Sequence, residues 1–191
     1  MDINYTKNFF NYYCFNKPLD KKSIDNIINL SNSFPITEGT TTDSNIKNDR
    51  KSNLRWIKQT TSSEWLYTEL KTIINYANNN FFGFDITNYN ENIQFTEYSN
   101  GGKYNWHQDV IRDNPIVRKL SIVIQLSSPQ EYVGGILQMK QVEEETDLIS
   151  SIPRQLGSII VFPSHMLHKV TQVVDGNRKS LVWWAGGAPF K

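Results

Sequence analysis

This chain of 191 residues has few cysteines and no signal-like start, and each absence excludes a class of protein. A single cysteine, Cys14, cannot form an intramolecular disulfide. The first residues, Met1 to Phe10, lack the basic start and the apolar run of a secretory signal. We therefore expect a protein of the reducing cytoplasm, or of the host cytoplasm if the coding genome is viral.

The chain also lacks a charge excess and long hydrophobic runs. Its 20 Lys and Arg side chains nearly balance its 19 Asp and Glu side chains, whereas nucleic-acid-binding proteins carry broad cationic surfaces. No stretch reaches the apolar length of a membrane span. We therefore expect neither duplex nucleic acid nor a membrane as partner. The length fits one domain, residues 1–191.

The first half of the chain predicts helical support for a sheet. Residues 19–30 place apolar side chains at helical spacing, and a second apolar-periodic run follows Ser62 and Ser63. Between these runs, Gly39–Asn53 is polar and predicts a long loop. A lid over a site and a solvated excursion both fit such a loop. We assign residues 1–91 to helical support with a lid-like loop.

The second half of the chain is β-rich. Short apolar and β-branched runs are separated by glycine turns. Strands that follow helices predict an α+β chain, in which residues 92–191 form a sandwich or barrel. The expected strands cover residues 94–98, 120–126, 136–139, 158–162, 167–174 and 180–184.

The most informative stretch is Tyr104-Asn105-Trp106-His107-Gln108-Asp109. Side chains alternate along a strand, so His107 and Asp109 should share one face while Gln108 points the other way. Asn105 should share the ligand face, which makes it a candidate substrate contact. Two histidines and a carboxylate form the facial triad of non-haem Fe(II) oxygenases, so the pair needs a second histidine. A buried, hydrogen-bonded His–Asp pair without a metal is the alternative.

The chain has three histidines, so the missing ligand is His165 or His168. Metal chemistry alone does not separate them. His168 leads into a β-rich run, where a sheet would fix its direction, whereas His165 follows Pro163 in a loop. We therefore choose His168. The alternative for His168 is a hydrogen-bonded polar residue of the sandwich.

An arginine, Arg178, begins the next predicted strand, with Ser180 on the same face. An arginine that faces into a barrel is costly unless it meets an anion, and a dicarboxylate cosubstrate would meet it with two parallel hydrogen bonds. A surface arginine on the outer face is the alternative. Trp184 shares the Arg178 face and is a candidate wall of the site, although core packing explains it equally well.

These residues together resemble the Fe(II)- and 2-oxoglutarate-dependent dioxygenases, in particular their prolyl 4-hydroxylase-like branch. The similarity covers about Gln94 to Trp184. It implies a double-stranded β-helix, or jelly roll, flanked by N-terminal helices. The motifs that resemble the family are the ligand strand Tyr98-x-x-Gly101-x-x-Tyr104-x-x-His107-x-Asp109, the glycine turn Gly134-Gly135-x-Leu137, and a closing section with Gly157 to Phe162, His168 and Arg178.

The resemblance implies an iron site and a cosubstrate site. Fe(II) would be held by His107, Asp109 and His168. Arg178 would pair with the far carboxylate of 2-oxoglutarate, and Tyr98 would hydrogen-bond nearby. Further cosubstrate candidates, which match positions where relatives carry hydroxyl groups or lie on the Arg178 face, are Ser121, Gln125 and Ser180.

The implied reaction is a hydroxylation that uses O2, releases succinate and CO2, and takes ascorbate as an optional reductant. We expect the substrate to be a prolyl residue in a protein or peptide. One alternative is the same chemistry on a free amino acid, a small metabolite or a nucleobase. The other is a non-enzymatic jelly-roll module that holds a metal.

Overall fold

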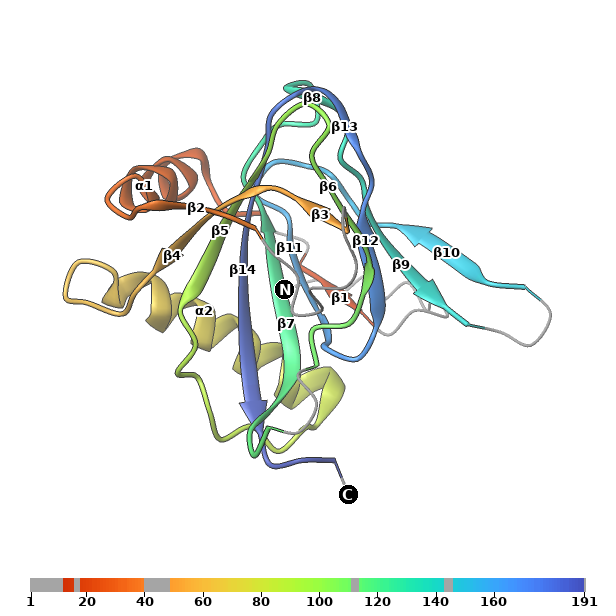
Figure 1. Ribbon diagram of the computed structural model, residues 1–191. Helices are drawn as coiled ribbons and strands as arrows, with labels where there is room; N and C mark the ends of the chain where they lie inside the picture. Colours follow the sequence, from red (N-terminus) through yellow and green to blue (C-terminus); the bar gives the residue numbers. More distant parts are fainter. Residues whose placement is uncertain (1–11, 16–17, 40–48, 111–113, 143–145, 191) are drawn as a thin grey trace.

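The computed structural model describes residues 12–15, 18–39, 49–110, 114–142 and 146–190. Two antiparallel sheets, one of seven and one of five strands, pack together with a small two-stranded sheet at one end (Figure 1).

The seven-stranded sheet has the order β1 (Tyr13–Cys14), β11 (Ile159–Pro163), β7 (Val117–Gln125), β14 (Arg178–Gly187), β5 (Ile93–Tyr98), β4 (Asn53–Ile57) and β2 (Ile36–Glu38). The five-stranded sheet has the order β10 (Leu148–Ser151), β9 (Leu137–Gln141), β12 (Leu167–Val170), β6 (Lys103–His107) and β3 (Arg50–Lys51). β8 (Tyr132–Gly134) pairs with β13 (Val173–Gly176). The expected jelly-roll core is confirmed.

Two helices cover the outer face of the seven-stranded sheet: α1 (Lys21–Ser31) and α2 (Glu64–Ala77), the latter continuing into a π-helical turn, η1 (Asn78–Phe82). The side chain of Asp20 caps α1 by accepting a hydrogen bond from the Ser23 amide at 2.7 Å. α2 buries a stripe of apolar side chains at helical spacing against the sheet. None of the helices within the described ranges is long and apolar enough to cross a membrane.

Alternation along the central strands separates the helix side of the large sheet from the interior of the sandwich. On β7, Ile122 and Ile124 belong to the cluster under the helices, whereas Val123 belongs to the cluster between the sheets. On β14, Trp183 packs on the helix side, with its ring 5.4 Å from that of Tyr67. Because strand side chains have a period of two, the even-numbered residues of β14 then face the sandwich interior.

The stretch Gly39–Asn53, expected to be a long loop, contains regular structure at its end. β3 pairs with β6, and Asn53 begins β4. The strand just before Gly39, β2, pairs with β4. Sheet pairing explains the difference, because edge strands need few apolar side chains and so leave no apolar period in the sequence. Residues 40–48, on which the lid hypothesis depends, lie outside the described residues.

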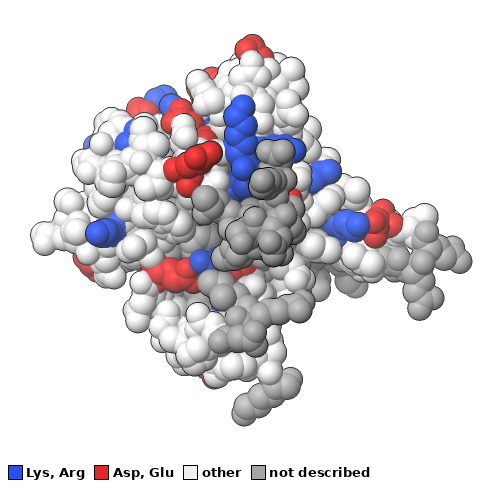
Figure 2. Space-filling view, in the orientation of Figure 1, with Lys and Arg blue, Asp and Glu red and all other residues white. Residues whose placement is uncertain are grey.

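Charges of both signs lie side by side on the face shown in Figure 2. No broad surface of one sign stands out among its coloured residues, in keeping with the near balance of the composition.

Candidate metal centre

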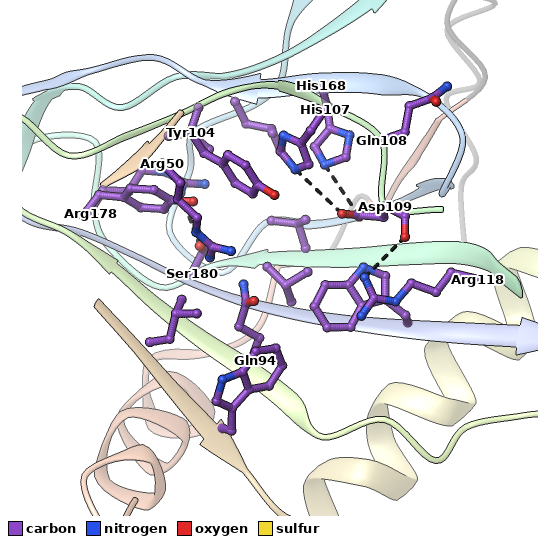
Figure 3. A pocket seen from close by; sticks show the side chains of 18 of the residues that line it. Arg50, Gln94, Tyr104, His107, Gln108, Asp109, Arg118, His168, Arg178 and Ser180 are labelled. Atoms are coloured by element: carbon purple, nitrogen blue, oxygen red, sulfur yellow. Dashed lines mark hydrogen bonds and ion pairs between the residues drawn. The ribbon is translucent and has the colours of Figure 1, made fainter. Parts of the chain in front are cut away.

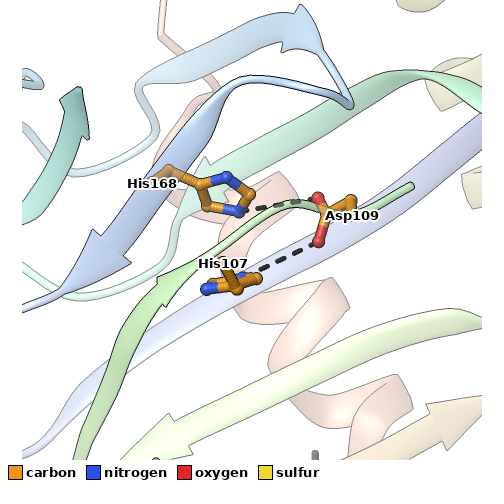
Figure 4. Close-up of side chains that lie close together, drawn as sticks. All are labelled: His107, Asp109 and His168. Carbon is orange, nitrogen blue, oxygen red and sulfur yellow. Dashed lines mark ion pairs between the residues drawn. The ribbon is translucent and has the colours of Figure 1, made fainter. Parts of the chain in front are cut away.

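Three side chains converge where β6 ends beside β12. His107, the last residue of β6, is the direct pairing partner of His168 on β12, and Asp109 lies two residues beyond the end of β6 (Figure 4). The Nε2 atom of His107 lies 3.7 Å from Asp109 Oδ1, and that of His168 lies 3.6 Å from Asp109 Oδ2. One ligand atom from each residue fits within 4.8 Å of the others. A single metal ion could therefore contact all three.

Hydrogen bonds to the backbone fix the tautomer of both imidazoles. The Nδ1 atom of His107 lies 2.8 Å from the carbonyl of Asn105, and that of His168 lies 2.8 Å from the carbonyl of Met166. A carbonyl oxygen only accepts, so both Nδ1 atoms carry the proton and donate. In the neutral rings the lone pair is then on Nε2, the atom that faces Asp109, as a metal ligand requires.

The charge states of the triad also suit a cation. Burial, followed by repulsion from His168, lowers the pKa of His107 to about 3. Burial raises the pKa of Asp109, but the two imidazoles and the Ser121 hydroxyl outweigh it and leave that pKa at about 2. At neutral pH the centre thus offers a carboxylate and a neutral imidazole. Two imidazole nitrogens and a carboxylate oxygen are the donor set of non-haem Fe(II) sites, so the residues fit that ion.

The two remaining candidates for the third ligand are separated by the structure. His168 is 5% exposed and points at Asp109. His165 lies in the turn after β11, is exposed, and places its ring 5.9 Å from that of Phe190. The choice of His168 from its strand position agrees with this geometry.

A buried cation lies in the same part of the sandwich. Arg178 is 1% exposed, and its Nη2 donates to Gln125 Oε1 at 2.9 Å while Nη1 donates to Ser180 Oγ at 3.2 Å. Its Nε is buried without a hydrogen-bond partner, and no carboxylate among the described residues forms an ion pair with it. Burial lowers the pKa of Arg178. An uncompensated guanidinium with an unused donor fits an anionic ligand.

The glycine turn helps to seat this arginine. Gly135 has a φ of +57°, and a Cβ added there would lie 3.1 Å from Arg178 Cδ. A side chain at this position would be strained and would press on the arginine.

A cavity of about 710 Å³ joins the triad to Arg178 (Figure 3). It is lined by side chains from both sheets, so neither sheet alone forms it. Tyr98, Ser180 and Trp184, all expected at the site, are among its walls. Other lining residues, which sequence reasoning did not assign, include Glu38, Arg50, Trp56, Gln94, Tyr104 and Arg118.

Comparison with known proteins identifies the second half of the chain. Residues 93–186, which contain the triad and Arg178, match the sequence model of the 2OG-Fe(II) oxygenase superfamily. This segment is a 2OG-Fe(II) oxygenase domain. The name of this superfamily specifies Fe(II) and 2-oxoglutarate (2OG). The triad fits the metal ion, and Arg178 fits the anionic 2-oxoglutarate.

Relatives of the oxygenase domain agree with the match. The chain is 36% identical over 94 residues to a PKHD-type hydroxylase from Shewanella baltica, an alignment that covers 47% of this chain and 40% of the relative. It thus spans less than half the length of the curated relatives it matches.

Two solved structures share the fold over nearly the whole chain. The first is a prolyl hydroxylase from Trichoplax adhaerens in complex with a hypoxia-inducible-factor peptide fragment, with a TM-score of 0.72 and 18% identity over 93% of this chain and 84% of that one. The second is a prolyl-4-hydroxylase from Pseudomonas putida, with a TM-score of 0.70 and 18% identity over 93% of this chain and 92% of that one.

Two cosubstrate candidates occupy supporting positions in the oxygenase domain. Ser121 is not a cavity wall; its Oγ donates to Asp109 Oδ2 at 2.7 Å. Gln125 is likewise absent from the lining and accepts from Arg178. Both point into the sandwich, as expected from β7. The sequence could not show that each side chain would form a hydrogen bond with another residue of the protein, because those residues lie in other parts of the sheets.

The expected place of Asn105 at the site is wrong, because its side chain is exposed and does not line the cavity. Gln108 is also exposed and its Nε2 donates to the carbonyl of His165, away from the triad, but the residue forms part of the cavity wall, which the sequence did not predict. The pairing of β6 with β12 shifts register between Tyr104 and His107, so the simple alternation fails just before the ligands. Asn105 contributes through its carbonyl, which accepts from His107.

Sequence analysis did not assign Arg118 or Arg50 to the site, because nothing in their local sequence distinguishes them from surface arginines. Arg118 forms an ion pair with Glu91 and places its guanidinium carbon 3.7 Å from the ring centre of Trp184. Arg50 lies 4.5 Å from the ring centre of Tyr104. Only cross-strand packing brings these arginines to the cavity.

Proposed function

We propose that the chain is an Fe(II)- and 2-oxoglutarate-dependent dioxygenase that hydroxylates a prolyl residue in a peptide or protein. The observation that carries the proposal is that the triad and the uncompensated guanidinium of Arg178 line one cavity. A structural zinc site would use similar ligands, but it would give no reason to bury a cation nearby without a counterion.

The metal ligands would be His107, Asp109 and His168. Held there, Fe(II) would supply, with 2-oxoglutarate and O2, the oxidation that places one oxygen atom in succinate and the other in the substrate, with release of CO2. The backbone carbonyls behind the two imidazoles hold the Nε2 lone pairs toward the centre before any ion arrives.

Arg178 would orient the cosubstrate. Its guanidinium is held in place by Gln125 and Ser180, so its remaining donor capacity is preorganised for a carboxylate. The ring centre of Tyr98 lies 5.4 Å from the guanidinium carbon of Arg178, so this ring also faces the proposed carboxylate site. A dicarboxylic acid bound by its far end would then extend along the cavity toward the triad.

Aromatic side chains would orient the substrate. Trp56 and Trp184 lie with ring centres 6.3 Å apart, and Tyr104 stacks on His107 with ring centres 3.5 Å apart at 13°. The compact, apolar pyrrolidine ring of proline suits packing against such faces. The peptide fragment in the Trichoplax prolyl hydroxylase structure supports a peptide as the substrate class.

The test is succinate formation from 2-oxoglutarate by iron-reconstituted protein, with and without proline-containing peptides. The expected result is Fe(II)-dependent succinate release, increased by a peptide that gains one oxygen atom by mass spectrometry. Turnover of 2-oxoglutarate with oxidation of free amino acids or nucleobases alone would replace the prolyl substrate with the small-molecule alternative. Protein that holds iron but neither binds 2-oxoglutarate nor releases succinate would overturn the proposal.

A further inference from the structure

Two serine hydroxyls lie in series behind the Asp109 carboxylate. The Oγ of Ser121 donates to Asp109 Oδ2 at 2.7 Å, and the Oγ atoms of Ser121 and Ser164 lie 2.9 Å apart. Both serines are 0% exposed, so bulk water does not reach either hydroxyl. Asp109 is itself only 9% exposed at its side chain. Its carboxylate orientation therefore depends on protein partners.

The direction of these hydrogen bonds follows from the chemistry of the groups. An ionised carboxylate accepts and does not donate, so the single hydroxyl proton of Ser121 is committed to Asp109. The bond between the two hydroxyls must then use the proton of Ser164. The chain of donors runs from Ser164 to Ser121 to Asp109, and each bond strengthens the next by polarisation.

The backbone makes the same connection. Asp109 lies beyond the end of β6, and its amide donates to the carbonyl of Ser164 at 2.8 Å. The amide of Ser164 in turn donates to the carbonyl of Lys119 on β7 at 3.0 Å. Arg118 Nη1 also donates to the carbonyl of Asp109 at 3.3 Å. Asp109, which follows a strand of the five-stranded sheet, is thereby tied to the seven-stranded sheet, across the sandwich.

We propose that Ser121 and Ser164 are positioning residues that hold Asp109 in its metal-binding orientation. Without the proton from Ser121, a buried carboxylate oxygen loses its partner and the side chain gains freedom to rotate away from the imidazoles. Partners of this kind, one step behind a metal ligand, contribute roughly 10–100-fold to metal affinity. The inference rests on the proposed function in that it assumes the triad holds a divalent metal.

The experiment is a titration of metal-free protein with Mn²⁺, followed by calorimetry, and with Co²⁺, followed by visible absorption. Ser121→Ala should weaken Mn²⁺ binding by roughly 10–100-fold and alter the Co²⁺ spectrum. Ser164→Ala should weaken binding less, because Ser121 keeps its own proton for Asp109. The double variant should resemble Ser121→Ala alone, since Ser164 acts through Ser121. Ser121→Thr, which keeps the hydroxyl, should retain most of the affinity.

The matched control is Ser63→Ala. Ser63 is also 0% exposed, and its Oγ donates to the carbonyl of Lys58 at 2.6 Å, away from the triad. This variant should lose thermal stability without losing Mn²⁺ affinity, which separates a folding defect from a positioning defect. Equal Mn²⁺ affinity in the wild type and in folded Ser121→Ala protein would overturn the inference. Failure of the wild type itself to bind Mn²⁺ or Co²⁺ would instead overturn the proposed function.

Discussion

His107 and His168 are direct pairing partners on adjacent strands, and their ring centres lie 4.1 Å apart. The ladder between β6 and β12 therefore sets the distance between two of the three proposed ligands. Each ring is then held by a carbonyl two residues before it. The centre is built into the sheet, so it should bind metal without a large rearrangement.

Removal of one of these histidines should abolish tight metal binding. His168→Ala leaves two ligands, and we expect the calorimetric Mn²⁺ signal of the wild type to disappear, along with Fe(II)-dependent succinate release. His165→Ala is the matched control, since His165 is exposed and outside the triad, and it should bind Mn²⁺ as the wild type does. A His168→Ala protein that binds as tightly as the wild type would refute the ligand assignment.

Arg178 should determine the affinity for 2-oxoglutarate. Hydrogen bonds to charged groups contribute about 1.5–3 kcal/mol, so Arg178→Ala should weaken 2-oxoglutarate binding to Mn²⁺-loaded protein by roughly 10–150-fold. Arg178→Lys should recover part of the loss, because it restores the charge but not the planar fork. Lys179→Ala, one residue further along β14 and on its other face, serves as the control. Unchanged binding in Arg178→Ala protein would exclude this cosubstrate site.

Substitution of Gln108 should impair turnover more than substitution of Asn105. Asn105→Ala keeps the carbonyl that accepts from His107, so metal affinity and turnover should stay close to those of the wild type. Gln108→Ala removes a cavity wall and its hydrogen bond to the His165 carbonyl. We expect it to raise the KM for the substrate, measured from initial rates. A larger loss in Asn105→Ala than in Gln108→Ala would mean that the β6 register is different.

Cys14 should react slowly and only at high pH. Burial raises the pKa of its thiol, so less thiolate is present in the folded protein at any given pH below that pKa. The rate of alkylation by iodoacetamide should therefore reach half its maximum at a higher pH in the native protein than in urea. Coincident pH profiles for the two states would show that the thiol is exposed.

The helices and the jelly roll should unfold together, as expected for a single domain over residues 1–191. Ile74 on α2 is 0% exposed within the cluster that joins the helices to the large sheet. Ile74→Ala should lower the free energy of unfolding by about 2–5 kcal/mol. Ile149→Ala, at a position that is 52% exposed, should change it little. Urea denaturation followed by fluorescence and by circular dichroism should give one coincident transition, and two separate transitions would argue for two domains.

The sequence alone determined the class of fold and the chemistry of the centre. Short apolar and β-branched runs predicted most strands of the second half, because a strand that is buried on both faces carries apolar side chains in succession. The His-x-Asp spacing and the shortage of histidines left few choices for the ligands. The residues around Arg178 left an inward and a surface position open, the family resemblance implied the inward one, and the side chain is 1% exposed.

Tertiary structure decided the contacts between strands. Ser164 lies next to Ser121 because β11 pairs with β7, a register that local sequence does not encode. The shift in the β6–β12 ladder, which displaces Asn105 from the expected ligand face, arises from pairing and not from residue preference. The ligands could be predicted because metal chemistry restricts residue type. The groups that hold those ligands could not, because serines, carbonyls and arginines are common and only packing selects among them.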